Sequence, residues 1–330
     1  MEFIFTAIIV IVFFAILILG HEIGHFAAAK LLKFEVQEFG FGLPPKIFGR
    51  KWRDTEYSLN AIPFGGFVRV TALDYSTEES FQIPFWKKAI VFVSGVFMNL
   101  IIAWAVFSII FMIGAPKGVY VSAIMDNSPA QIAGIKTGDK LIDFQYLAPL
   151  INTIGSTESG DSLTLRVERE RKILNIVVTP IIDEGVSRIG VELMETGFPK
   201  EGFFQSFQSG AETTWSFIVR IIEAITTMFR YGDFTDTAGP VEVFVAIRVT
   251  EDMGIIYFLQ LLGVVSLNLM IINLLPLPAL DGGHILILFV EKIRRKPINR
   301  QLILRINSIS YFFLLLLMFV VTIRGIIRLF

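Results

Sequence analysis

The sequence predicts a polytopic α-helical membrane protein with four transmembrane helices, a cytoplasmic-side membrane-associated β-hairpin and one small extracytoplasmic mixed β/α domain. Three observations predict this fold class. Hydrophobic residues make up 54% of the 330 residues, above the roughly 45–50% of soluble domains, and the mean hydropathy is +0.66. Four apolar runs are separated by polar stretches, and basic residues gather in two of those intervals.

The first apolar run covers residues 3–20, and we expect its helix to continue to about residue 32. Eighteen helical residues extend about 27 Å, which is enough to cross the hydrocarbon core. The run has no basic leader and no small-residue cleavage site, so we interpret it as a retained span rather than a signal peptide. His21-Glu22-Ile23-Gly24-His25 follows it directly.

This H-E-x-x-H motif is typical of zinc hydrolases. On a helix, His21 and His25 share one face and can bind the same metal, and Glu22 can reach a water molecule on that metal as general base. The chain has no cysteine, so thiolate ligands and disulfides are excluded and a third ligand must be a carboxylate or the only other histidine, His284. The alternatives are a chance match and a helix end whose polar groups are satisfied at the membrane surface.

Residues 34–89 form a polar interval that is rich in basic side chains. The basic residues in and around it are Lys30, Lys33, Lys46, Arg50, Lys51, Arg53, Arg69, Lys87 and Lys88. The positive-inside rule places this interval in the cytoplasm and the N-terminus outside. Residues 38–45 predict a Gly/Pro turn, and residues 57–61 and 66–70 predict two short strands around a turn that contains Gly65 and Gly66. The result is a surface hairpin, or one that dips into the membrane and offers an open edge to an extended peptide.

The second span, residues 90–114, runs outward and carries Asn99, whose amide needs a partner inside the helix bundle. Residues 118–182 then change to short strands at 119–121, 140–144, 162–167 and 173–178. Ser128 and Pro129 predict a helix start, as N-cap and first helical residue. The phrase S-P-A-x-x-A-G followed by G-D-x-L/I resembles a PDZ domain, and the alternative is a structural spacer. PDZ domains bind peptides by strand addition.

Residues 183–254 predict a linker with an amphipathic helix at 212–231. Arg220 and Glu223 lie in the middle of that helix. If it crossed the membrane, the next span would run outward and would carry its polar residues to the side opposite His21. We therefore interpret it as a helix on the membrane surface.

The third membrane segment, residues 255–291, contains Asn268 and Asn273 and is then interrupted by prolines before Asp281. Irregular backbone at membrane depth is tolerated only inside protein or along a cavity, so the interruption indicates a site. Asp281 should reach the same depth as His21, which makes it a plausible third ligand. His284 shares its helical face and is the alternative.

A basic loop at 292–306 and a fourth span at 307–330 complete a topology with both termini outside. The predicted segments are residues 1–33, 34–89, 90–114, 118–182, 183–254, 255–291, 292–306 and 307–330.

With both motifs in view, the chain resembles the site-2 protease family of intramembrane zinc metalloproteases, in particular the bacterial regulator-of-sigma-E protease group. H-E-x-x-H and the N-x-x-P-x-P-x-L-D-G run at 273–282 carry the resemblance, with minor signatures at 39–42, 63–67 and 239–240. It implies that His21, His25 and Asp281 bind Zn²⁺ with Glu22 as base. It also implies that Asn268 and Asn273 hold substrate backbone, and that Gly65 and Gly66 guide it. Val96 departs from the proline of many relatives, and some relatives have two PDZ domains.

The resemblance implies regulated intramembrane proteolysis: peptide-bond hydrolysis within or near the transmembrane segments of single-span membrane proteins, such as anti-sigma factors or remnant signal peptides. It implies a bacterial cytoplasmic (inner) membrane location, with the active site toward the cytoplasm and a peptide C-terminus or segment at the PDZ domain. The net charge of −1 gives no reason to expect nucleic acid. The rival hypotheses are a non-catalytic PDZ-bearing membrane scaffold, which the intact Glu22 disfavours, and a metal transporter, which would need polar residues spread through several spans.

Overall fold

The computed structural model describes residues 2–73, 78–158, 160–169, 172–183, 186–232 and 239–329. The chain divides into two compact units. One comprises Met1–Phe107, Ala211–Val245 and Leu261–Phe330, and the other comprises Ser108–Gly210 and Ala246–Gln260. The first unit is called the helical unit below and the second the sheet unit.

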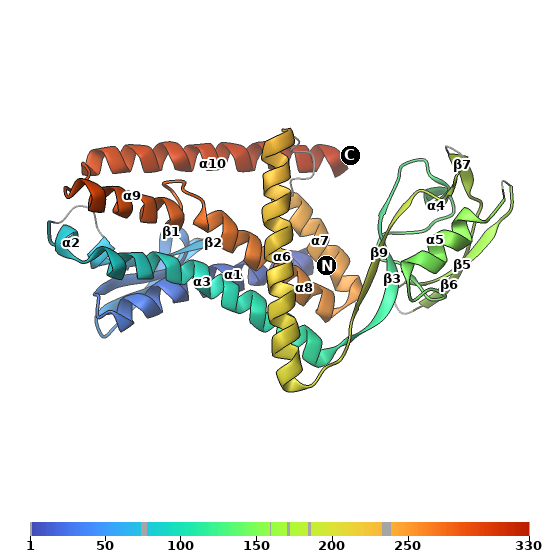
Figure 1. Ribbon diagram of the computed structural model, residues 1–330, viewed down its shortest axis with the longest axis horizontal. Helices are drawn as coiled ribbons and strands as arrows, with labels where there is room; N and C mark the ends of the chain where they lie inside the picture. Colours follow the sequence, from blue (N-terminus) through green and yellow to red (C-terminus); the bar gives the residue numbers. More distant parts are fainter. Residues whose placement is uncertain are drawn as a thin grey trace. The chain divides into compact units, whose positions relative to one another are not determined.

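Four helices in the described part of the chain are long and apolar enough to span a membrane, which confirms the number predicted (Figure 1). They are α1 (Glu2–Leu31), α3 (Phe85–Ile113), α8 (Ile255–Leu274) and α10 (Arg300–Leu329). The helix α9 (Asp281–Arg294) follows the interruption after α8. The predicted loop at 292–306 is wrong in extent, because only residues 295–299 lie between α9 and α10. Arginine and lysine are good helix formers, so both helices continue beyond their apolar parts.

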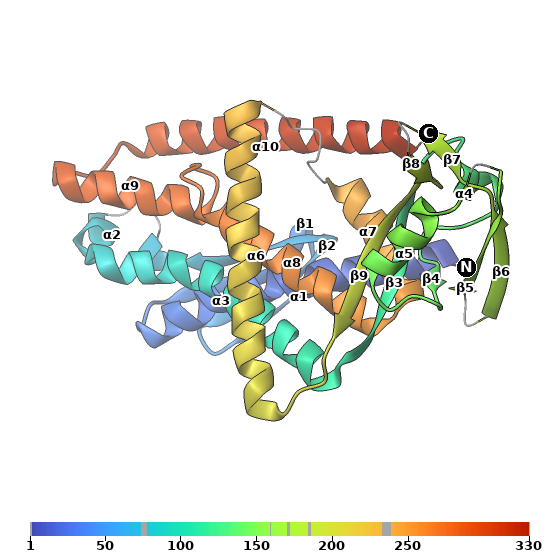
Figure 2. The ribbon, with the colours of Figure 1, turned by 45° about the vertical axis from the view of Figure 1, so that its right-hand side comes forward.

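The region predicted as a linker, residues 183–254, is mostly regular structure. Besides short strands it contains α6 (Phe203–Tyr231) and α7 (Pro240–Met253). The helix α6 begins before the predicted range of 212–231 and is not one of the four helices apolar enough to span a membrane. In Figures 1 and 2 it runs across α10 rather than alongside it.

The sheet of the helical unit differs from the simple hairpin that the sequence predicted. The two long strands β1 (Val36–Trp52) and β2 (Thr55–Val70) are antiparallel, and their register shifts fold them into four adjacent segments. Residues 66–70 pair with 36–41, and residues 38–41 also pair with 56–59. On its other side, this last segment, extended to 55–60, pairs with 46–52. The two strands predicted as neighbours are therefore separated by residues 36–41, and the predicted turn at 38–45 lies within β1. The glycines of that stretch do not break the strand, because each lies where a neighbouring segment approaches closely.

The sheet runs back along α1. At one end, the Lys30 Nζ donates to the Thr55 Oγ1 at 2.8 Å, near the C-terminus of the helix. Further along, the ring of Phe26 contacts that of Phe39, with centroids 5.4 Å apart. At the other end, Gly66 packs against Glu22 and Ile18. The turns near residues 43–45 and 62–65 are thus farthest from the C-terminal end of α1. Residues 71–82 add the short helices η1 (Thr71–Leu73) and α2 (Glu78–Gln82).

The sheet unit contains five strands in the order β6-β5-β4-β3-β9. They are β3 (Ala115–Ile124), β4 (Lys140–Leu141), β5 (Leu163–Arg169), β6 (Lys172–Val178) and β9 (Val191–Phe198), with α4 (Pro129–Ile132), α5 (Leu147–Gly155) and the separate hairpin β7 (Ile181–Asp183) and β8 (Val186–Arg188). The core includes Val119, Leu150 and Leu165. The Ser128 Oγ accepts from the backbone N–H of Gln131 and Pro129 begins α4, as predicted. The edge strand β9 lies outside the predicted domain range of 118–182.

Candidate metal centre

The helix α1 presents His21 and His25 one turn apart at its contact with α3. Two glycines make this contact close. A Cβ atom on Gly24 would lie 2.3 Å from the carbonyl oxygen of Ser94, and one on Gly95 would lie 2.4 Å from Nε2 of His25. Small residues allow membrane helices to approach at backbone distance. The side chains of His21 and His25 therefore lie directly against the backbone of α3.

Asp281 reaches the same point because it is the first residue of α9. The interruption between α8 and α9 folds tightly against the first turn of α9. Cβ atoms on Gly282 and Gly283 would lie 2.3 Å and 2.1 Å from the carbonyl oxygens of Leu274 and Leu277. The start of a helix favours a carboxylate, because the helix dipole is positive there. The two glycines after Asp281 thus allow the chain to turn and direct the carboxylate toward α1.

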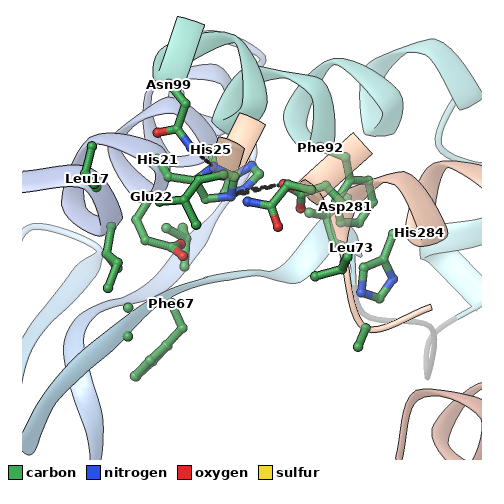
Figure 3. A pocket seen from close by; sticks show the side chains of 18 of the residues that line it. Leu17, His21, Glu22, His25, Phe67, Leu73, Phe92, Asn99, Asp281 and His284 are labelled. Carbon is green, nitrogen blue, oxygen red and sulfur yellow. Dashed lines mark hydrogen bonds and ion pairs between the residues drawn. The ribbon is translucent and has the colours of Figure 1, made fainter. Parts of the chain in front are cut away.

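The three side chains fit a metal ion with an open coordination position. Nε2 of His21 lies 3.0 Å from Nε2 of His25 and 3.0 Å from Oδ2 of Asp281, and the distance from His25 to the same oxygen is 3.4 Å. Zinc bonds of about 2.0–2.1 Å at tetrahedral angles separate neighbouring ligand atoms by about 3.3–3.4 Å. Oδ2 of Asp281 is buried and has no hydrogen-bond partner in the described part of the chain. Figure 3 shows the three groups pointing toward one another.

Hydrogen bonds behind the ligands orient the two imidazoles. Nδ1 of His25 lies 2.7 Å from the carbonyl oxygen of Val91, so Nδ1–H donates and Nε2 remains free to bind a metal. The amide Nδ2 of Asn99 lies 3.4 Å from Nδ1 of His21. Asn99 is fully buried, and its Oδ1 has no partner among the described residues. With the amide turned over, that oxygen accepts from Nδ1–H of His21 and leaves Nε2 facing the metal.

The ligands line a cavity of about 480 Å³ within the helical unit, and Glu22 lines it with them. Gly65 and Gly66 line it from β2, and Asn273 lines it from the end of α8. Asn268 is not among the lining residues of this cavity, and its role in holding substrate stays a prediction. It is five residues before Asn273, which places the two amides about 140° apart around the helix axis.

His284 lines the cavity but lies apart from the ligand cluster. Its ring stacks on Phe92, with centroids 5.0 Å apart, and Figure 3 shows it on the other side of Asp281. Among the described residues, the acidic and histidine side chains close enough to share a metal are His21, His25 and Asp281. This geometry favours Asp281 over His284 as the third ligand.

Two residues of the site were missed or only partly recognised from the sequence. Asn99 was expected to need a polar partner, and His21 is that partner. Gly95 was not recognised, although glycines in two neighbouring spans are a known signal of close helix packing.

The chain is similar over nearly its whole length to known proteins. Residues 9–317 match peptidase family M50. A Clostridium perfringens protein whose name assigns it to the zinc metalloproteases is 33% identical, with 95% of this chain and 96% of that protein aligned. The regulator of sigma-W protease RasP of Bacillus subtilis is 27% identical over 99% of this chain and 100% of its own length. The zinc metalloprotease RasP of Bacillus licheniformis is 27% identical, over 98% and 99%. The chain therefore belongs to peptidase family M50, the site-2 protease family.

Proposed function

We propose that the chain is a zinc metalloprotease that hydrolyses peptide bonds within or near the transmembrane segments of membrane proteins. The observation that carries the proposal is the placement of three metal-ligand atoms and Glu22 around one cavity, within the C-terminal half of an apolar helix. Zinc bound there would polarise a water molecule and the scissile carbonyl.

His21, His25 and Asp281 hold the metal, and Glu22 takes a proton from the attacking water and returns it to the leaving amine. Glu22 is adjacent to His21 in the sequence and is therefore rotated about 100° from it around α1. This rotation directs Glu22 toward β2, where a Cβ atom on Gly66 would lie 2.8 Å from its Cγ. The general base thus lies between the metal ligands and the strand.

The β2 segment 66–70 offers a partner for an unwound substrate. It pairs with β1 on one side, and Phe67, Val68 and Val70 line the cavity. A transmembrane helix satisfies its own backbone groups, so a substrate that unwinds in the membrane must find replacement partners. Strand addition to this edge supplies them, and the Asn273 amide supplies one more near the metal.

The distribution of basic residues supports the proposed topology. Basic residues at 292–300 and in the sheet flank the membrane segments on the side of the catalytic cavity, which favours a cytoplasmic position for it and extracytoplasmic termini. The protein would then lie in the bacterial cytoplasmic membrane, with α6 on its outer surface. We propose that the five-stranded sheet of the sheet unit, with α4 and α5, is a PDZ domain, because the S-P-A start of α4 and the edge strand β9 beside α5 match that arrangement. Its ligand would be a peptide C-terminus or segment.

The proposed substrates are single-span membrane proteins such as anti-sigma factors or remnant signal peptides. The name of one relative makes it a protease that regulates sigma-W, which supports the first class. A catalytically inactive Glu22→Gln variant would accumulate the uncut substrate and allow it to be identified by mass spectrometry.

The decisive test uses the full chain in lipid nanodiscs with a single-span substrate. Glu22→Gln should keep its zinc and lose cleavage by about 10²-fold or more. Asp281→Ala should lose zinc, whereas His284→Ala should keep it. Cleavage that survives Glu22→Gln would overturn the assigned base, and a scaffold would show no chelator-sensitive cleavage at all. Zinc flux into sealed vesicles without cleavage would instead support a transporter.

A further inference from the structure

A second cavity of about 620 Å³ lies on the β1–β2 sheet, away from the metal centre. Most of its lining comes from one face of three adjacent segments, where the side chains of alternate strand residues lie. Phe48, Arg50 and Trp52 come from one segment, Tyr57, Ser58 and Leu59 from the next, and Phe39 and Phe41 from the third. We propose that this face binds a phospholipid with an anionic headgroup.

The cavity is graded from apolar to basic along α1. The row of paired residues farthest from the C-terminal end of α1 is Phe41, Leu59 and Phe48. The next row pairs Phe39 and Tyr57 with Arg50, and the last pairs Trp52 with Thr55, which receives a hydrogen bond from Lys30. The hydrocarbon and headgroup regions of a leaflet follow each other in the same order. An acyl chain therefore fits along the first row and a phosphate beside Arg50.

The exposed side chains around the cavity agree with a lipid environment. Ile47 and Phe48 are 67% and 61% exposed near the apolar end. Trp52 is 61% exposed at the basic end, where the guanidinium of Arg53 lies 5.1 Å from its ring centroid. Tryptophan and arginine gather at the level of the lipid headgroups. Water is a poor solvent for the exposed side chains of Ile47 and Phe48. An anionic headgroup would interact favourably with Trp52 and Arg53.

Charge complementarity identifies the headgroup. Two carboxylates of the sheet are already occupied: Lys46 pairs with Glu38 and Glu56, and Arg69 also pairs with Glu38. Arg50 has no carboxylate within ion-pair distance in the described part of the chain, although it lines the cavity. A guanidinium binds phosphate through two parallel hydrogen bonds. The cavity therefore presents an unpaired cation at the position where the lipid phosphate would lie.

The adjacent Lys51 provides a matched control. It belongs to the same segment and is also exposed, but it is not among the residues that line the cavity. Neighbouring strand residues point to opposite faces. Replacing Lys51 removes one positive charge from the same surface without changing the proposed site.

The experiment measures lipid retained by the full chain after transfer from mixed phosphatidylglycerol and phosphatidylcholine micelles into lipid-free detergent, by native mass spectrometry. Wild type should retain phosphatidylglycerol in preference to phosphatidylcholine. Arg50→Gln should weaken that retention about fivefold, whereas Lys51→Gln should leave it unchanged. Phe48→Ser should weaken retention of both lipids. Zinc content and the unfolding temperature verify that each variant is folded.

Equal losses of phosphatidylglycerol retention in Arg50→Gln and Lys51→Gln would overturn the proposal and indicate general electrostatic attraction to the surface. Equal retention of the two lipids by the wild type would also overturn it. A photo-crosslinking amino acid in place of Trp52 identifies the occupant directly. An adduct with the mass of phosphatidylglycerol is expected. An adduct with a substrate protein, or with a second copy of the chain, would refute the lipid assignment. None of these measurements depends on protease activity.

Discussion

Replacing Gly95 with alanine should disable the metal centre without touching a metal ligand. The new Cβ atom would lie 2.4 Å from Nε2 and 2.5 Å from Cε1 of His25, and 2.8 Å from Cε1 of His21. The imidazole of His25 cannot swing aside freely, because its Nδ1 is 2.7 Å from the carbonyl oxygen of Val91 on the same helix α3. The clash therefore falls on the ligand atom itself.

The size of the displacement follows from the distances. Ordinary van der Waals contact begins near 3.4 Å, so the ring of His25 must move by about 1.0 Å. Metal–ligand bonds tolerate only about 0.2 Å, and a misplacement of about 1 Å in an active site can cost about 10²-fold in rate. The overpacked contact should also cost about 1–3 kcal/mol of stability. We expect zinc affinity and cleavage each to fall by at least about 100-fold.

Zinc affinity is measured by competition with a chelator of known affinity, on the full chain in nanodiscs. The matched control is Gly20→Ala. Gly20 lies on α1, and its Cβ would meet the side chain of Ile102 on α3, with the terminal Cδ1 at 2.2 Å. A flexible side-chain end can move. That variant should keep most of its zinc. If Gly95→Ala binds zinc as tightly as wild type, the close approach of α3 does not determine the position of the metal ligands.

Three further predictions address the same site and its supporting sheet. Asn99→Ala should lower zinc affinity about 10–100-fold, measured by the same competition; unchanged affinity would show that Asn99 does not orient His21. Gly66→Ala should reduce kcat while zinc stays bound, because the added methyl group displaces Glu22. If the variant instead loses its zinc, displacement of Glu22 does not explain the lower kcat. Burial raises the pKa of the Glu38 carboxyl, but hydrogen bonds from Ser58 and Lys46 and the charge of Arg69 lower it by more. The pKa in the folded protein is therefore below its usual value of 4.5. Its stabilising effect should be complete above about pH 4.5 and should be lost as the pH falls through the folded-state pKa; unfolding temperatures of wild type and Glu38→Gln should therefore converge in acid, and parallel curves would refute this.

The four membrane helices could be predicted because each is a long apolar run, and length alone distinguishes such runs from soluble helices. The interruption before Asp281 was equally visible, since two prolines cannot continue a helix. The two motifs are local patterns with fixed spacing. Their meeting in space was expected from the predicted orientation of the two spans, which brings both motifs toward the same side.

The pairing within β1 and β2 was not predictable, because register shifts are set by contacts between distant residues. Glycines at 40 and 42 looked like turn residues. In the structure they lie inside β1, where Phe67, Ser58 and backbone carbonyl oxygens of β2 leave no room for a side chain. A glycine in a strand marks either a bend or a close approach, and the sequence alone does not distinguish them. His21 could not be predicted as the partner of Asn99 for the same reason, because the two residues are 78 positions apart in the sequence.

The position of Glu22 links the chemistry to the fold. A helix that presents two histidines toward α3 and α9 must present the intervening glutamate toward another neighbour, and here that neighbour is the strand segment 66–70. A substrate paired with that edge would place its backbone beside both the general base and the metal ligands. In a membrane, an unwound peptide must find backbone partners within protein, and a free strand edge offers a row of them. In this chain such an edge lies against the glutamate of the H-E-x-x-H motif, and the absence of a side chain at Gly66 allows the two to meet.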